Sequence, residues 1–308
     1  MTRVALIVTG DAEFAALHRS LQRAFPSLEF VRHASPPGQP MDGFTSNRLR
    51  GDEPVLARPT PDGIAMLSPL AKLIDQLVLG VHPERNGVPY DHAVLIDDLE
   101  LDNTDQPERV VAHVRAAIPA RIDAQWPSQA LRDRVRATVR ERCSFHLLCP
   151  MLEGYFFCDE DALDRAGRVA GRASLVDGRR IEDFAVDDPT YAEVPLPEGA
   201  TKRTMKSDWR RSPERRARHP KKYLQYLCDP SLDGGTRYDE ATTGAQALSS
   251  LAWPAVLSAE RDVRFVRSLF ADLARIAAPA VGVTVPDDLT CAPPTARFAA
   301  RDRVLRNV

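Results

Sequence analysis

Two adjacent carboxylates, with a third two positions on, end an apolar run at residues 93–100. The run reads AVLIDDLE, and its length and polar borders predict a buried strand of an α/β sheet. Ligands of open α/β sheets bind at the carboxyl ends of strands, where uncompensated negative charge favours a bound cation or a basic partner. Asp97, Asp98 and Glu100 therefore indicate metal-assisted chemistry. Alternatively, these acids lie in a solvated turn that caps the helix expected near Pro107.

Two further carboxylates extend this hypothesis. Glu153 interrupts the apolar stretch at 150–157, where a buried carboxylate needs a cation or several hydrogen-bond donors. Glu13 closely follows the first expected strand, and carboxylates from two strand ends suit Mg²⁺ or Mn²⁺. Alternatively, Glu153 caps a neighbouring loop or forms an ion pair with an arginine of the preceding helix. For Glu13, the alternative is an ordinary helix start capped by Asp11.

The segment 201–222 is strongly basic. It contains ten Lys or Arg residues against two acids, on a chain with a formal net charge of −2. Such a local excess favours contacts with the phosphates of DNA or RNA, and Trp209 and Tyr223 could stack on bases. Alternatively, the segment pairs with the acidic stretch before it or is a solvated linker. The expected phosphate-contacting residues are Lys202, Arg203, Lys206, Arg210, Arg211, Arg215, Arg216, Arg218, Lys221 and Lys222.

Alternating strands and helices must position these residues. Hydrophobic periodicity predicts strands at 3–9, 27–32 and 93–98, and helices at 13–25, 64–79, 107–118 and 128–143. A long loop is expected at 33–63. This alternation predicts an α/β fold with a parallel or mostly parallel sheet. The expected parts of the chain are an α/β core at 1–175, an irregular acidic-then-basic segment at 176–222 and a helical region at 223–308.

Composition narrows the class of protein. With 308 residues and 44% hydrophobic content, the chain should form a folded globular protein. Without 18 consecutive apolar residues or a signal-peptide pattern, no membrane association is expected. Five cysteines argue against a disulfide framework and for the cytoplasm. The spacing around His146 does not favour zinc, and glycine-rich phosphate loops and a GxSxG elbow are absent from the sequence.

The order of these motifs resembles an uncharacterised bacterial family with a TOPRIM-like (topoisomerase-primase) core, related to the overcoming-lysogenization-defect nucleases. The resemblance is carried by short segments: LIVTGDAEF, AVLIDDLE, PMLEGYFFCDEDAL, and HPKKYLQYL with YDEATTG. It implies a small, mostly parallel sheet with helices on both faces and a divalent metal held by a Glu after the first strand and an Asp-x-Asp after a later one. It also implies an ATPase partner subunit.

Only some of the family's metal-binding positions are occupied by acidic residues in this sequence. Thr9 stands where the family has its first Glu, and Glu13 falls at the second acidic position. Asp97 matches the first Asp of the later motif, whereas Asp98 and Glu100 are displaced by one position from the second. Glu153 fits the third acid.

Three functions remain open from this resemblance: a metal-dependent nuclease in genome maintenance or phage defence, a catalytically silent binding module, and a defence component that needs another subunit. In the nuclease, Asp97, Asp98, Glu100 and Glu13 hold Mg²⁺ or Mn²⁺, and Glu153 completes the catalytic set.

Overall fold

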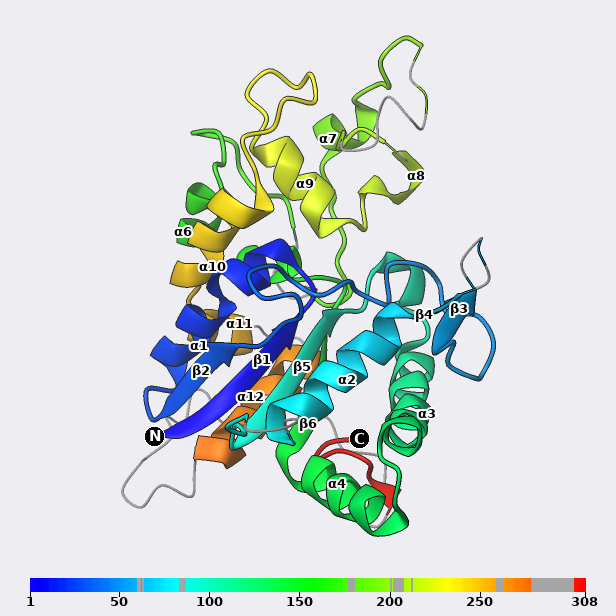
Figure 1. Ribbon diagram of the computed structural model, residues 1–308. Coiled ribbons are helices and arrows are strands. Elements are labelled where there is room, and N and C mark those ends of the chain that lie inside the picture. The colour runs from blue at the N-terminus through cyan, green and yellow to red at the C-terminus, as the bar shows by residue number, and fades with distance from the viewer. Residues whose placement is uncertain are drawn as a thin grey trace. The chain divides into compact units, whose positions relative to one another are not determined.

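The chain forms two compact units, which are described separately. Unit 1 comprises Met1–Gly10, Leu21–Leu148 and Arg264–Val308, and unit 2 comprises Asp11–Ser20 and Cys149–Val263. The sequence-based division at 175 and 222 follows changes in composition and stays a prediction. The computed structural model describes residues 1–59, 62, 64–82, 87–176, 181–199, 201, 208–211, 213–258, 263–277 and 302–308 (Figure 1).

Unit 1 is built on a four-stranded parallel sheet with the strand order β2-β1-β5-β6. Its strands are β1 (Thr2–Val8), β2 (Leu28–Arg32), β5 (His92–Asp98) and β6 (Cys143–Leu148). Val4–Val8 and 93–97 are buried continuous runs, as expected for strands covered on both faces. The parallel α/β fold expected from the sequence is therefore confirmed.

The chain order creates a switch point between β1 and β5. From β1 the chain moves to β2 on one side and later returns to β5 on the other, with Val8 paired to Ile96. The loops after β1 and β5 thus leave the same edge of the sheet in opposite directions. Ligands of open α/β sheets bind at such points.

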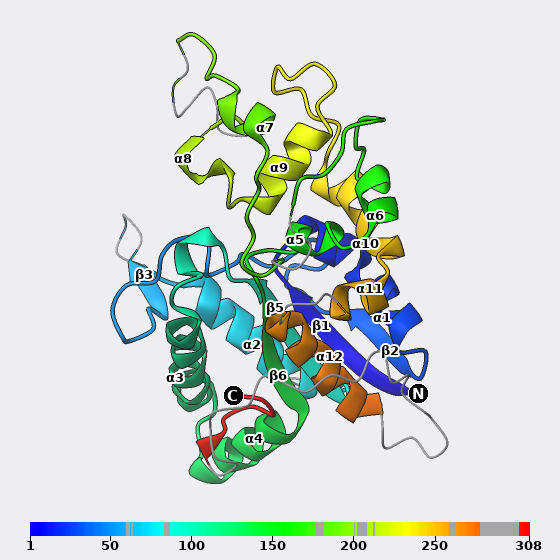
Figure 2. The ribbon, with the colours of Figure 1, turned by 180° about the vertical axis from the view of Figure 1, so that it is seen from behind.

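Helices cover both faces of this sheet. α2 lies on one face and α12 on the other (Figures 1 and 2). Apolar residues of α12 recur at Val266, Leu269, Phe270 and Leu273, the spacing that places side chains on one helix face. The helices of this unit are α2 (Pro69–Val81), α3 (Pro107–Gln125), α4 (Gln129–Arg142) and α12 (Arg264–Ala277).

The segment between β2 and α2 differs from the sequence-based expectation. Instead of one long loop, it contains the hairpin of β3 (Ala57–Pro59) and β4 (Ala65–Leu67). The expected helix at 64–79 starts later, because the Ser68 hydroxyl accepts a hydrogen bond from Ala71 N and Pro69 occupies the first helical position. A 3₁₀ turn, η2 (Leu101–Asn103), follows β5.

Unit 2 is helical in its described parts. It begins with a π-helical turn, η1 (Glu13–Leu17), which leads into α1 (His18–Ala24) across the unit boundary. Its other helices are short, and those from Pro220 onwards, together with α12, confirm the expected helical C-terminal part of the chain. The short helices are α5 (Glu153–Phe156), α6 (Glu160–Arg165), α7 (Pro189–Glu193), α8 (Pro213–Arg216), α9 (Pro220–Leu227), η3 (Glu240–Gly244), α10 (Ala245–Ser250) and α11 (Trp253–Leu257).

Within the described parts of the chain, no helix combines the length and the apolar character needed to cross a membrane.

Candidate functional site

Thr9 and Asp97 meet at the carboxyl ends of β1 and β5. The Thr9 hydroxyl donates to Asp97 Oδ1 at 2.5 Å, and the Thr45 hydroxyl lies 3.1 Å from Oδ2. Thr45 is also 2.6 Å from the carbonyl oxygen of Asp98, so its single proton is shared between two acceptors. Gly43 allows this close approach, because a Cβ there would lie 3.1 Å from Asp97 Oδ1.

Burial dominates the electrostatics of Asp97. Desolvation raises the pKa of this carboxyl to about 6, although the hydrogen bonds from Thr9 and Thr45 act in the opposite direction. Both carboxylate oxygens are already engaged by hydroxyl groups. A cation at Asp97 would therefore have to displace one of them, which weakens the case for a metal site at this position.

Asp98 and Glu100 follow Asp97 at the end of β5, and their assignment as metal ligands stays a prediction. Asp98 is half-buried at the end of β5, next to the buried Leu99. Glu100 turns the chain into η2 with φ 61° and ψ 154°, a conformation that favours glycine. Among the residues that the structure describes, no group of three or more His, Cys, Asp or Glu side chains is arranged to hold a metal ion.

The loop at 43–51 is held against this sheet edge by a buried amide that the sequence analysis missed. Asn103 donates to the backbone oxygens of Thr45 and Asn47 at 2.7 and 3.2 Å, and its Oδ1 accepts from Leu49 N at 3.0 Å. Gln106 donates to the carbonyl oxygen of Leu49 at 3.1 Å. These contacts join positions more than 50 residues apart, so no local pattern in the sequence could have revealed them.

Glu13 and Glu153 come together in unit 2, where they form an acidic centre with Glu240, Lys221 and Tyr238. Glu13 begins η1 and Glu153 begins α5, and both side chains are buried. Tyr238 donates to Glu153 Oε1 at 2.9 Å. Lys221 of α9 lies 3.9 Å from the same oxygen and forms a close ion pair with Glu240. Three carboxylates thus share one lysine.

The carboxyl groups of this centre disfavour one another's charged forms. Burial, followed by the charge of Glu153, raises the pKa of Glu13 to about 8. Burial also raises the pKa of Glu153, against the opposing effects of Lys221 and the Tyr238 hydroxyl. A pair of buried carboxylates with raised pKa values marks a functional-site candidate. The sequence analysis identified Glu13 and Glu153, but Tyr238 and Glu240 became visible only in the structure.

The described part of the basic segment makes many internal contacts. Arg216 is buried and donates to the backbone oxygens of Tyr191 and Val194 at 3.3 and 3.0 Å. Arg210 pairs with Asp208 at 2.5 Å, and Lys222 donates to the carbonyl oxygen of Asp208 at 2.9 Å. Arg216 thus contacts the backbone of the preceding acidic stretch, whereas Arg210 and Lys222 pair within the basic segment itself.

Other residues of the segment remain at the surface. Arg215 is exposed, and Arg218 pairs with Asp183 at 3.0 Å while both side chains stay more than half exposed. Arg211 is half-buried. A phosphate backbone could reach these three side chains from solvent. The predictions for Lys202, Arg203 and Lys206 lie outside the described residues.

The two aromatic side chains proposed to stack on bases belong to the core instead. Trp209 is fully buried and donates to Asp229 Oδ2 at 2.9 Å. Tyr223 is equally buried and donates to Asp188 Oδ2 at 3.0 Å. The stacking hypothesis was wrong for both, because their apolar surface packs against Tyr191 and Tyr226.

Comparison with family models, curated proteins and solved structures finds no match to this chain. The resemblance to TOPRIM-like proteins accordingly stays an expectation from the sequence.

Proposed function

We propose that this protein acts on nucleic acid as a divalent-metal-dependent phosphodiesterase, with the acidic centre of unit 2 as its reaction site. The observation that carries the proposal is the burial of Glu13 beside Glu153, with Lys221 placed among three carboxylates. Such a pair is costly to the fold in its charged form, so it takes up a proton or a cation. A bound cation would replace the proton and let both carboxyl groups ionise.

Two carboxylates of the acidic centre, rather than all three, would hold Mg²⁺ or Mn²⁺, because no group of three in the described residues is arranged for a metal ion. Glu13 and Glu153 offer oxygen ligands, and Mg²⁺ is commonly bound by only one or two carboxylates while it keeps several waters. The bound cation would neutralise phosphate charge and lower the pKa of a coordinated water. Lys221 would contact the substrate phosphate, and Tyr238 holds Glu153 in place through its 2.9 Å hydrogen bond. Asp97 is not part of this revised site.

The surface arginines supply the proposed contact with the substrate backbone. Arg211, Arg215 and Arg218 would bind phosphates without reading base sequence, on DNA or RNA. We place the protein in the cytoplasm, in keeping with the described cysteines, none of which is in a disulfide bond. A role in genome maintenance or phage defence, and an ATPase partner subunit, are further parts of this proposal that rest on the TOPRIM-like resemblance.

Cleavage of labelled DNA and RNA with Mn²⁺ or Mg²⁺ tests the proposal. The wild type should cleave at least one substrate, and Glu153→Gln should slow cleavage by about 100-fold or more, because the lost charge leaves the cation poorly held. Glu193→Gln changes an exposed glutamate of the same unit and should cleave like the wild type. Equal cleavage by Glu153→Gln and the wild type would place the reaction elsewhere.

A second function, a catalytically silent binding module, is favoured by one observation. Thr9 stands where the resembling family has a metal-binding Glu, and its hydroxyl engages Asp97 instead. A neutral hydroxyl cannot replace that negative charge for a hard cation. Salt-sensitive binding of nucleic acid, without cleavage under any metal condition, would support this alternative.

A further inference from the structure

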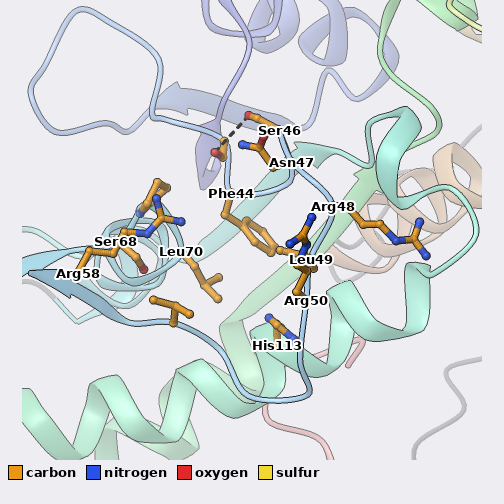
Figure 3. A pocket seen from close by; sticks show the side chains of 13 residues that line it. Phe44, Ser46, Asn47, Arg48, Leu49, Arg50, Arg58, Ser68, Leu70 and His113 are labelled. Carbon is orange, nitrogen blue, oxygen red and sulfur yellow. Dashed lines mark hydrogen bonds between the residues drawn. The ribbon is translucent and has the colours of Figure 1, made fainter. Parts of the chain in front are cut away.

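An arginine-lined cavity lies in unit 1, beside the loop that holds Asp97. Its walls are the loop at 43–50, β3 and the start of α2, and it encloses about 290 Å³ (Figure 3). Ser68, Leu70 and His113 are buried at its lining, and His113 Nε2 lies 3.1 Å from the carbonyl oxygen of Gly51. That contact ties α3 to the loop and gives the cavity a fixed wall.

The lining is positively charged. Arg48, Arg50 and Arg58 line the cavity, which includes no Asp or Glu among its described lining residues. Arg48 is neutralised, because it forms a bidentate pair with Asp105 at 2.8 Å for both bonds. In the described part of the chain, neither Arg50 nor Arg58 forms an ion pair, and both side chains are exposed. Two guanidinium groups are thus available to an anion.

The cavity also has an apolar wall. In Figure 3, Arg58 lies on one side of the Phe44 ring and Arg50 on the other. Leu70 and Val55 add aliphatic surface. Polar groups that fix the orientation of a ligand beside apolar surface are typical of small-molecule sites. An anion bound by the arginines would have its uncharged part against this wall.

The position of the cavity in the fold favours a ligand site. Its loop carries Thr45, whose hydroxyl contacts Asp97 at the carboxyl end of β5. The switch point between β1 and β5 lies at the same sheet edge. The N-terminus of α2, a helix of 13 residues, also opens on the cavity and adds a favourable field for negative charge.

We propose that this cavity binds a phosphate group, with Arg50 and Arg58 as its ligands and Phe44 against the organic part that carries it. Arginine suits this role because its planar guanidinium donates two parallel hydrogen bonds to phosphate oxygens. The volume lies just below the range of roughly 300–1,000 Å³ common for small-molecule sites, so it suits one nucleotide unit rather than a dinucleotide. The inference concerns unit 1 and does not rest on the acidic centre of unit 2.

Calorimetric titration in EDTA at low salt tests the proposal with three probes: inorganic phosphate, thymidine 5′-monophosphate, and the dinucleoside monophosphate TpT. At least one should bind at a single site. The double variant Arg50→Gln/Arg58→Gln should weaken that binding by about tenfold or more, since charge-assisted hydrogen bonds are lost. Preference for the monophosphate points to a free nucleotide as the ligand, and preference for TpT points to a nucleic-acid backbone.

Matched controls separate the cavity from general charge effects. Arg134→Gln/Arg140→Gln removes two exposed arginines of α4 and should bind the probe like the wild type. Val55→Glu places a negative charge at an exposed lining position and should weaken binding, whereas Val55→Gln should not. Glu153→Gln should retain binding, which makes this test independent of the proposed nuclease activity. Absence of binding for all three probes, or wild-type affinity in Arg50→Gln/Arg58→Gln, would overturn the inference.

Discussion

Asp97 and Glu13 are both buried carboxylates, but their surroundings compensate their charge differently. Hydroxyl groups of Thr9 and Thr45 engage both oxygens of Asp97, so its charged form is partly stabilised within the fold. For Glu13, burial and then the neighbouring charge of Glu153 raise the pKa. The hydrogen bonds from Thr9 and Thr45 thus compensate much of the Asp97 charge without a bound cation. The arrangement around Glu13 favours an added cation, and this difference is why we assign the reaction site to Glu13 and Glu153.

The raised pKa of Glu13 predicts a pH-dependent stability. The folded state favours the protonated carboxyl, so this contribution to stability is fully present below the ordinary pKa of 4.5 and is lost as pH rises through about 8. Glu13→Gln mimics the protonated form. It should be more stable than the wild type at pH 9, by on the order of 1–3 kcal/mol, and similar at pH 4.

Urea unfolding at the two pH values measures this difference. Glu193→Gln, at an exposed position, should follow the wild type at both. A Glu13→Gln variant that is less stable than the wild type at pH 9 would show that the Glu13 charge is already compensated in the fold.

The hydrogen bond from Thr9 to Asp97 predicts a second effect. Thr9→Val removes the donor and leaves a buried carboxylate oxygen with one partner fewer, at a cost of about 1–3 kcal/mol at pH 8. The cost should shrink below pH 6, because Asp97 is then protonated in the folded state. Thr104→Val removes an exposed hydroxyl of the same unit and should change the unfolding free energy by less than about 0.5 kcal/mol. Equal effects of the two variants would mean that the Thr9 bond is not formed.

Helices and strands positioned by local patterns were predictable from the sequence, whereas contacts between distant segments were not. β5 and α4 follow from an apolar run and an amphipathic spacing that a reader can see in the residues alone. The burial of Glu153 was also predictable, from its apolar neighbours. Tyr238 lies 85 residues from Glu153, so their hydrogen bond depends on the packing of unit 2. The arginine-lined cavity likewise joins segments that are distant in the sequence. The β3–β4 hairpin was missed for another reason, because its strands are only three residues long and exposed, which leaves no alternation of buried and exposed side chains to detect.

Gly244 positions Tyr238 within the acidic centre, at the point where η3 meets α10. A Cβ at this glycine would lie 2.9 Å from the Tyr238 hydroxyl oxygen. Gly244→Ala should therefore displace Tyr238 from Glu153 and lower stability by about 1–3 kcal/mol. In a Tyr238→Phe background the same alanine should cost less, because the closest clashing atom is gone. Unfolding free energies of all four proteins in a double-mutant cycle measure this coupling, and strict additivity would rule it out.

The whole molecule has a net charge of −2, so any attraction to nucleic acid must come from local surfaces. The described basic segment divides into two groups. Arg210, Arg216 and Lys222 serve the fold, whereas Arg211, Arg215 and Arg218 reach the surface. Substitutions in the first group should therefore lower the stability of the fold, whereas substitutions in the second group should weaken nucleic-acid binding.

Arg211→Gln/Arg215→Gln should weaken nucleic-acid binding and reduce the slope of log affinity against log salt by about one for each phosphate that the variant no longer neutralises. Fluorescence anisotropy of a labelled oligonucleotide at several salt concentrations measures the slope. Arg134→Gln/Arg140→Gln has the same charge change on α4 and should keep the wild-type slope. Arg216→Gln should lower the melting temperature, because its guanidinium holds buried backbone oxygens. If the first variant keeps the wild-type slope, the binding surface lies outside this segment.

The central claim, that Glu13 and Glu153 form a cation site, is tested most directly by calorimetric titration with Mn²⁺. The wild type should bind at least one ion at pH 8, and Glu13→Gln/Glu153→Gln should lose one site, while Asp97→Asn should keep it. Heat release that is unchanged in Glu13→Gln/Glu153→Gln would contradict the account, as would a wild type that binds no Mn²⁺.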